Sequence, residues 1–120
     1  MSLNVPEDTN KAYTQAPIKV SIGMPAYNAE KHIRQALDSL LNQTYAEFEI
    51  IISNNGSEDQ TKAICDEYSA KDARVKVHHS PTNRGASWNF NRVLELAKGE
   101  YFMWAAHDDL WHPSFIEKCV

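Results

Sequence analysis

A nearly uninterrupted apolar run, Phe48-Glu49-Ile50-Ile51-Ile52-Ser53, is the feature that most constrains the fold. A strand with one face in water alternates apolar and polar residues. A strand of a parallel sheet is covered on both faces and is apolar along its whole length. The run at 48–53 is of the second kind, so helices are expected on both faces of its sheet. The sequence therefore predicts an α/β fold.

Three further strand candidates surround this run. They are 18–24, which is expected to end at Pro25; 74–79, whose charged face indicates a sheet edge; and 101–104, which is expected to be buried. Apolar residues at helical spacing follow the first three strands. These residues are Ile33, Ala36, Leu37, Leu40 and Leu41, then Ile64, Cys65 and Tyr68, then Phe90, Val93, Leu94 and Ala97. Right-handed crossovers make this order a Rossmann-like, mostly parallel sheet with helices on both faces.

The expected helix ends follow from residues with known terminal preferences. Asn28 and Ser87 are predicted to cap the first and third helices, and Ser57 with Gln60 has the spacing of a capping box. Gly99 is predicted to end the third helix in the positive-φ region, and a fourth helix is expected to begin near Pro113.

Composition bounds the domain organisation and the function classes. Residues 1–17 are polar and unpatterned, which predicts a flexible leader before one domain at 18–120. A net charge of −4 without a basic patch argues against a nucleic-acid partner. No apolar run approaches the roughly 20 residues of a membrane span. We expect a cytoplasmic protein, with peripheral association at the inner face of the membrane left open.

The loops after the strands are expected to share one rim of the sheet, where ligands of open α/β sheets bind. Asp108 and Asp109 follow the last strand, and paired carboxylates there can hold a divalent cation. An ordinary loop that caps the next helix is the alternative. His107 and His112 flank the pair and are either contributors to this site or solvated loop histidines.

A mononucleotide could lie across this rim. Tyr27 offers a face for stacking a base, Asn54 or Asn55 can pair with a base edge, and Arg84 could reach a base or a phosphate. The alternatives are a tyrosine packed over the first helix, plain turn chemistry for Asn54-Asn55-Gly56, and a solvated arginine. Neither a GxGxxG sequence nor a P-loop is present, which disfavours dinucleotide oxidoreductases and phosphate-loop NTPases.

Several segments together resemble a known family. They are Val20 to Asn28, Leu37 to Tyr45, Glu49 to Thr61, Asn83-Arg84-Gly85, Ala97 to Tyr101 and Asp108-Asp109. In order and spacing, from about residue 18 to residue 120, they resemble the inverting family 2 glycosyltransferases. The resemblance implies the nucleotide-binding half of a type-A glycosyltransferase fold. The implied reaction moves a sugar from a nucleotide-diphospho-sugar to a hydroxyl of a carbohydrate or lipid-linked acceptor, as in cell-surface polysaccharide or glycolipid synthesis.

The resemblance also implies a set of site residues. Asp108 would face the ribose, and Asp109 would hold Mg²⁺ or Mn²⁺ against the diphosphate. The residues expected to bind the nucleotide-sugar are Pro25, Ala26, Tyr27, Asn54, Asn55, Arg84 and Asp108, and the expected metal ligand is Asp109.

Three departures from the family pattern bear on function. Asn54 and Asn55 stand where the family usually has one or two aspartates, and Ala106 stands at the outer acid of its Asp-x-Asp pattern. No counterpart of the family's catalytic base is found, so we expect these 120 residues alone to bind nucleotide weakly without turnover. An exposed apolar surface on such a part would favour homo-oligomers.

Two other functions stay open at this point. A non-catalytic binding module of the same fold would explain both asparagines as marks of a lost donor site, and restoring an aspartate at either position would test it. A sugar-nucleotide nucleotidyltransferase is the weaker alternative, because Pro25-Ala26-Tyr27-Asn28 lacks the glycine-rich basic loop expected there.

Overall fold

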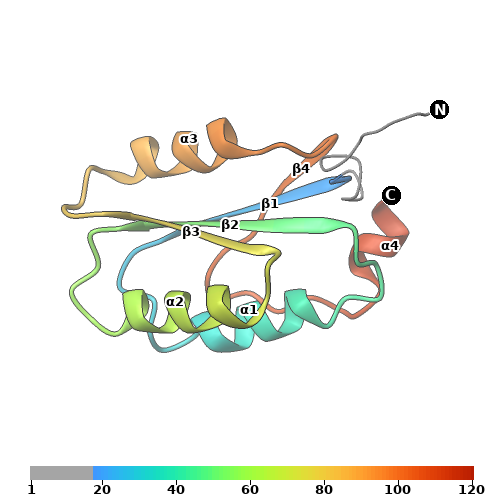
Figure 1. Ribbon diagram of the computed structural model, residues 1–120, viewed down its shortest axis with the longest axis horizontal. Coiled ribbons are helices and arrows are strands. Elements are labelled where there is room, and N and C mark those ends of the chain that lie inside the picture. Colours follow the sequence, from blue (N-terminus) through green and yellow to red (C-terminus); the bar gives the residue numbers. More distant parts are fainter. Residues whose placement is uncertain (1–17) are drawn as a thin grey trace, which may run out of the picture.

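The computed structural model describes residues 18–120, and the predicted leader at 1–17 lies outside them. The elements, in chain order, are β1 (Val20–Ala26), α1 (Ile33–Leu41), β2 (Phe48–Asn55), α2 (Thr61–Lys71), β3 (Val75–Ser80), α3 (Ala86–Leu96), β4 (Tyr101–Trp104) and α4 (Phe115–Cys119). All strand pairs are parallel, and the sheet order is β3-β2-β1-β4 (Figure 1). The predicted fold class and the edge position of β3 are confirmed.

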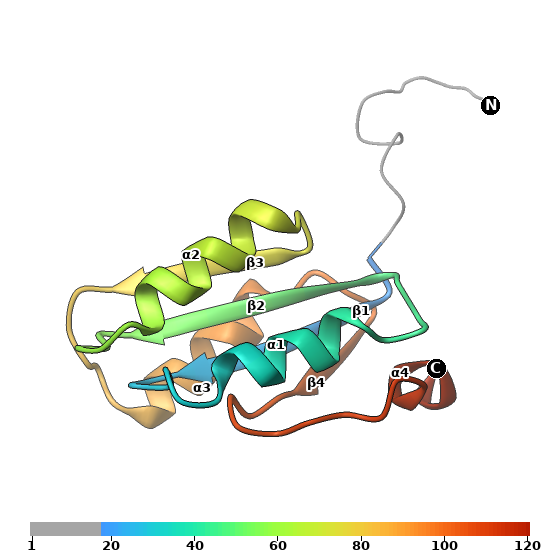
Figure 2. The same cartoon turned by 90° about the horizontal axis from the view of Figure 1, so that it is seen from below.

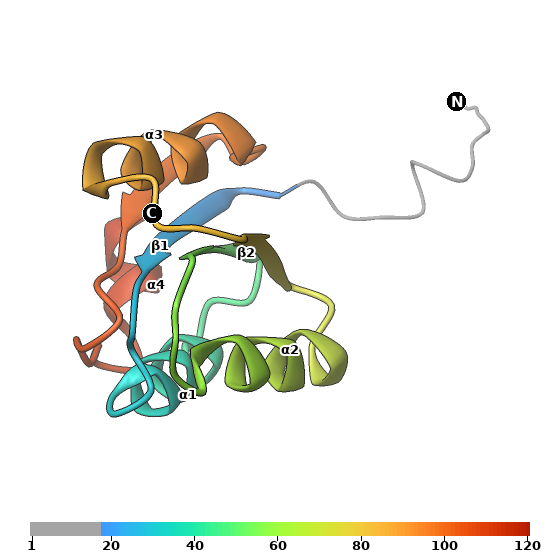
Figure 3. The same cartoon turned by 90° about the vertical axis from the view of Figure 1, so that its left-hand side faces the viewer.

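The sheet is the middle layer of three. Helices α1 and α2 cover one face and α3 covers the other, while α4 lies near the end where β1 begins (Figures 1 and 3). Every residue of β2 is buried, as the apolar run predicted. The main core fills the space between the sheet and α1 with α2. It includes Ile22, Met24, Ile50 and Ile52 from the strands and Ile33, Leu37, Leu40, Ile64 and Cys65 from the helices.

The prediction that β1 stops at Pro25 is wrong, because the strand continues to Ala26. Successive strand residues point their backbone groups to opposite neighbours, and the Gly23 carbonyl accepts from Ala105 on the β4 side. The backbone groups of Pro25, two residues after Gly23, therefore also point to the β4 side, where β4 has already ended at Trp104. Its missing N–H leaves no gap in the ladder with β2.

The turn after β2 begins two residues later than expected. Asn54 and Asn55 are the last strand residues, they pair with His79 and Ser80 of β3, and each is 2% exposed. The turn interpretation of these asparagines is therefore wrong. Gly56, with φ of 69°, makes the turn instead.

The predicted helix caps are wrong in all three cases, because α1, α2 and α3 begin without a side-chain cap. Asn28 has φ of 47° and accepts from the Glu58 amide across the rim. Ser57 accepts from the Asn28 amide, so it joins two loops rather than capping α2. Ser87 lies inside α3, which begins after Gly85.

Gly99 also acts differently from the prediction, since positive φ among the glycines is confined to Gly56 and Gly85. A Cβ at Gly99 would lie 2.7 Å from the Ser21 nitrogen and 2.8 Å from its hydroxyl. Gly99 is therefore required for the close approach of the α3–β4 turn to β1. Helix α3 ends earlier, at Leu96.

Burial on the α3 side is lower than expected. Of the predicted inner residues of α3, Val93 is fully buried, but Phe90 and Leu94 are 47% and 49% exposed. Strand β4 is an edge strand, and its Tyr101 and Trp104 are about half exposed, so the prediction of a buried strand is wrong. Helix α4 begins at Phe115, two residues after Pro113.

Candidate functional site

A pocket of about 480 Å³ opens at the carboxyl ends of β1, β2 and β4, where the sequence predicted the shared rim. Five predicted site residues line it: Pro25, Ala26, Tyr27, Asn55 and Asp109. Tyr27 is 41% exposed, which leaves part of its ring free for a ligand. As the shared rim predicted, the fold brings together residues that are up to 84 positions apart in the chain, from Pro25 to Asp109.

The acidic loop forms the wall next to β4. Strand β4 is joined to β1 up to the bond from the Ala105 amide to the Gly23 carbonyl, and a turn closes when the Asp109 amide donates to Ala106. Both Asp108 and Asp109 are exposed, and of the two only Asp109 lines the pocket. The loop thus brings one carboxylate to the space a ligand would fill.

Within residues 18–120, no three His, Cys, Asp or Glu side chains gather into a metal-binding group. Magnesium, however, is commonly held by one or two carboxylates together with substrate phosphates and water. Asp109 is a suitable ligand of that kind, and His107 lies in the same wall. The residues present fit a cation that arrives with a diphosphate rather than one that is held by protein alone.

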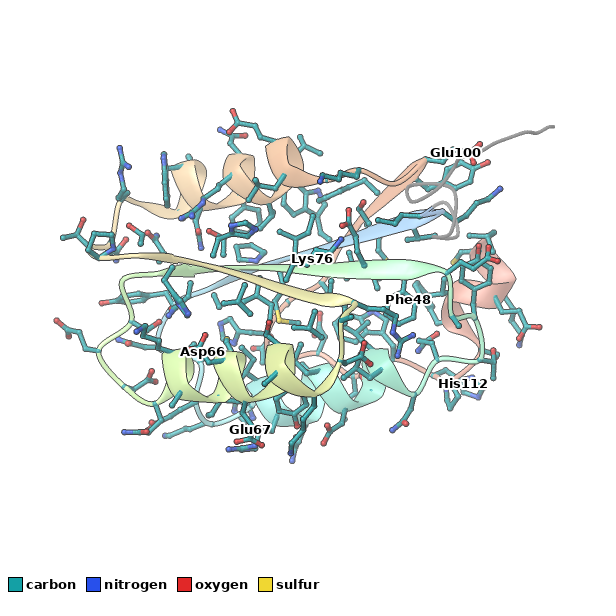
Figure 4. The ribbon with its side chains drawn as sticks, in the orientation of Figure 1. Phe48, Asp66, Glu67, Lys76, Glu100 and His112 are labelled. Atoms are coloured by element: carbon teal, nitrogen blue, oxygen red, sulfur yellow. The ribbon has the colours of Figure 1, made fainter. Side chains whose placement is uncertain are left out.

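The second flanking histidine lies elsewhere. His112 is near α4, away from the carboxyl ends of the strands (Figure 4). Its carbonyl accepts from Gln43 at the end of α1, and its Nδ1 lies 2.9 Å from the Ser114 hydroxyl. The structure therefore separates His112 from the acidic pair.

Two other predicted residues lie outside the pocket lining. Asn54 is beneath the rim, with its amide bonded to Ser57 and His79. Arg84 is exposed and stacks on Trp88, with the guanidinium carbon 4.6 Å from the ring centroid. Arg92 of α3 lies over the same ring at 5.1 Å, so two guanidinium groups contact Trp88.

Several residues that line the pocket were not predicted from the sequence as site residues. They are Asn83, Ala86, Asn89, Phe90, Trp104, Ala105 and Ala106. Phe90 and Trp104 pack together with ring centroids 5.1 Å apart and give the pocket an aromatic wall. Asn89 is 3% exposed and donates to the Ser53 carbonyl. Its spacing of four residues before Val93 was the available signal that it faces the sheet.

Hydrogen bonds join the first two loops of the rim. The Asp59 carboxylate accepts from the hydroxyl and amide of Thr61 and from the Glu30 amide. Burial alone would raise the pKa of Asp59, but these hydrogen bonds hold it below its usual value. The Thr61 hydroxyl lies 2.7 Å from the Ala29 amide, which fixes the segment after Tyr27.

Comparison with known proteins identifies the family. The model for glycosyl transferase family 2 matches residues 21–120. The chain belongs to glycosyltransferase family 2. Among curated family relatives, an uncharacterised glycosyltransferase of Rickettsia typhi is 41% identical over 107 residues, which are 89% of this chain and 32% of that protein. The putative glycosyltransferase EpsH of Bacillus subtilis is 40% identical over 101 residues, 84% of this chain and 29% of that protein.

Solved structures of glycosyltransferases have the same fold. S. aureus TarS in complex with UDP-GlcNAc superposes with a TM-score of 0.78 and 33% identity, covering 84% of this chain and 30% of that one. The mannosyltransferase PcManGT from Pyrobaculum calidifontis, in complex with GDP-Man and Mn²⁺, gives a TM-score of 0.70 at 24% identity and supports the fold alone. The chain thus spans about a third of the length of these family members.

Proposed function

We propose that the pocket binds the donor of a family 2 glycosyltransferase, a nucleotide-diphospho-sugar whose sugar is transferred with inversion to a hydroxyl acceptor. The observation that carries the proposal is the position of Tyr27 and Asp109 in the lining of one pocket at the carboxyl ends of the strands. An aromatic face suits a base, and a carboxylate suits the cation of a diphosphate.

We assign a binding role to the residues on each side of the pocket. Tyr27, with Pro25 and Ala26, stacks the base, and Asp109 holds Mg²⁺ or Mn²⁺ at the diphosphate. Arg84 and Asp108, which lie outside the lining, contact phosphate and ribose once a ligand extends over the rim. When bound, the cation neutralises charge on the leaving diphosphate. No residue of the described part is assigned as catalytic base, so the chain is proposed to position the donor.

The biological setting belongs to the same proposal. The acceptor is a hydroxyl of a carbohydrate or a lipid-linked molecule, in cell-surface polysaccharide or glycolipid synthesis on the cytoplasmic side. Among residues 18–120, no helix has both the length and the apolar character needed to cross a membrane. Peripheral association at the inner face of the membrane would bring such a domain to a lipid-linked acceptor.

Calorimetry with UDP-, GDP- and dTDP-sugars tests the donor site. In the presence of Mn²⁺ we expect heat with at least one of them, and no heat with any at millimolar concentration would refute the donor site. Asp109→Ala should remove the metal-dependent part of the affinity. Glu95→Ala is the matched control, since Glu95 is an exposed acid of α3 outside the pocket. Metal dependence that survives in Asp109→Ala would exclude Asp109 as the ligand.

A further inference from the structure

We propose that Asn54 and Asn55 are positioning residues that hold opposite walls of the pocket, rather than contacts to the base. The proposal rests on the proposed function, because the pocket is taken to be the donor site. The two asparagines are adjacent at the end of β2, and adjacent strand residues point to opposite faces of the sheet. Their side chains consequently reach different loops.

Asn55 holds the loop before α3. Its Oδ1 accepts from the Arg84 amide at 2.9 Å. Its Nδ2 donates to Oδ1 of Asn83 at 2.9 Å and to the Gly85 carbonyl at 3.1 Å. Both hydrogens and the oxygen of this amide are therefore engaged by three consecutive residues. Only the second lone pair of Oδ1 is left for a base, and Asn55 is 2% exposed.

Close packing holds the same loop against the end of β2. A Cβ at Gly56 would lie 2.4 Å from the Asn83 nitrogen, so the loop passes directly over this glycine. Asn83 and Ala86 line the pocket on this side. The position of the wall is thus set by the amide of Asn55 together with the missing side chain of Gly56.

Asn54 supports the wall that contains Tyr27. The Ser57 hydroxyl donates to Oδ1 of Asn54 and accepts from the Asn28 amide at 2.9 Å. Asn28 follows Tyr27 directly, so this bridge fixes the backbone next to the proposed stacking residue. On its other side, Nδ2 of Asn54 donates to Nδ1 of His79 at 3.0 Å.

The hydrogen bonds of His79 define the tautomer of its imidazole ring. Because Nδ1 of His79 accepts from an amide, the ring proton is on Nε2, which lies 2.8 Å from the Asp66 carboxylate. Asp66 comes from α2 and is labelled there in Figure 4. Asn54 therefore connects β3 and α2 to the loop that carries Tyr27.

Both networks use the donor and the acceptor of a side-chain amide. Each side chain must donate and accept at once, and an ionised aspartate only accepts. An aspartate in place of Asn55 would face the Asn83 oxygen and the Gly85 carbonyl without a hydrogen to offer. An aspartate in place of Asn54 would need a second ring proton on His79, at Nδ1, to keep this contact. The asparagines are thereby explained as parts of a working site, and a lost donor site is the explanation that this geometry disfavours.

The ligand-free chain provides the first test. In Asn54→Asp, the NMR signals of Asn28 and Ser57 should shift and their backbone should become more mobile, while those of Arg84 and Gly85 stay in place. Asn55→Asp should do the reverse. The side-chain amide of Asn55 should also exchange with solvent at least about tenfold more slowly than the exposed amide of Asn42. Equal exchange rates, or no separation between the two walls, would overturn the proposal.

Binding provides the second test. With UDP or GDP and Mn²⁺, whichever binds the unaltered chain, each aspartate variant should lose at least about fivefold in affinity, and Asn42→Asp should bind as the unaltered chain does. A gain in affinity in either variant would overturn the positioning roles and restore the lost-site explanation. If the unaltered chain binds no nucleotide, the proposed function fails, and the positioning claim is decided by the NMR comparison alone.

Discussion

A buried carboxylate, Glu49 of β2, connects β3 at one sheet edge to the α3–β4 turn at the other. It is 1% exposed and accepts from Ser21, from the Lys98 amide and from Nζ of Lys76. Lys76 is on β3 at one sheet edge (Figure 4), whereas Lys98 lies just before β4 at the other. A charge this deeply buried is tolerated because every oxygen has a donor.

The same anchor predicts a pH dependence of stability. Burial alone would raise the pKa of Glu49, but its three donors hold it below its usual value. A lowered pKa in the folded state adds stability above the unfolded pKa of about 4.3, and this stability is lost as the pH falls through the folded pKa. Glu49→Gln should lower the free energy of unfolding by about 2 kcal/mol in urea at pH 7, and it should reduce the loss of stability as the pH falls below about 5.

Glu95→Gln, at an exposed position of α3, is the matched control and should unfold as the unaltered chain does. An unchanged urea midpoint in Glu49→Gln would contradict the anchoring role.

At the level of single residues, the sequence predicted the location of side chains better than their hydrogen-bond partners. Tyr27 and Asp109 were located because strand-end loops share a rim, and this rule needs only the order of strands. The partners of Asn55 are about 30 positions away in the chain. Local sequence patterns carry no information on hydrogen bonds between such distant residues. The sequence therefore predicted that Asn55 pairs with a base, whereas its side-chain amide is bonded to the loop before α3.

Among the elements, α3 shows why helical spacing alone can choose the wrong face. Phe90 and Leu94 are apolar and four apart, yet they are half exposed, while Asn89 and Val93 face the sheet. The Asn89 amide donates to the Ser53 carbonyl at the end of β2. The buried pair of Asn89 and Val93 therefore sets the orientation of this helix.

This orientation predicts a contrast between two substitutions. Asn89→Ala removes a buried hydrogen bond and should lower the free energy of unfolding by about 1–2 kcal/mol. Leu94→Ala, at a half-exposed position, should change it by less than about 0.5 kcal/mol. Chemical denaturation of both variants measures the difference. A larger loss in Leu94→Ala would show that the apolar stripe, and not the asparagine, faces the sheet.

On the scale of the whole molecule, the two edges of the sheet differ. Strand β3 carries Lys76 and two histidines, which discourage pairing with another strand. Strand β4 has the sequence Tyr-Phe-Met-Trp without a charge, and both terminal aromatic residues are about half exposed. Figure 2 shows β4 at the margin of the sheet opposite β3. An apolar edge without a charge favours association.

We therefore expect the 120-residue chain to self-associate through β4 as its concentration rises. Tyr101→Lys adds a charge at the edge and should shift sedimentation equilibrium toward the monomer. Asn42→Lys adds the same charge at the end of α1 and should leave the equilibrium unchanged. A chain that stays monomeric up to millimolar concentration would contradict this expectation.

The whole fold was more predictable than its parts because order and handedness restrict parallel sheets to few arrangements. Four strands, their parallel sense and the covering helices followed from apolar runs and spacing. Burial at β4 did not, since a short apolar run has the same composition at a sheet edge as at its centre. Whether a strand has one neighbour or two is decided by topology beyond the run itself.

The central claim is that the pocket at the carboxyl ends of the strands binds a nucleoside diphosphate. Chemical-shift mapping of the labelled chain with UDP or GDP and Mg²⁺ tests it most directly. We predict saturable shifts that cluster at Tyr27, Asn83 and Asp109. Shifts confined to the smaller cavity between β4 and α4, near Met103 and Phe115, or no shifts at millimolar nucleotide, would contradict the claim.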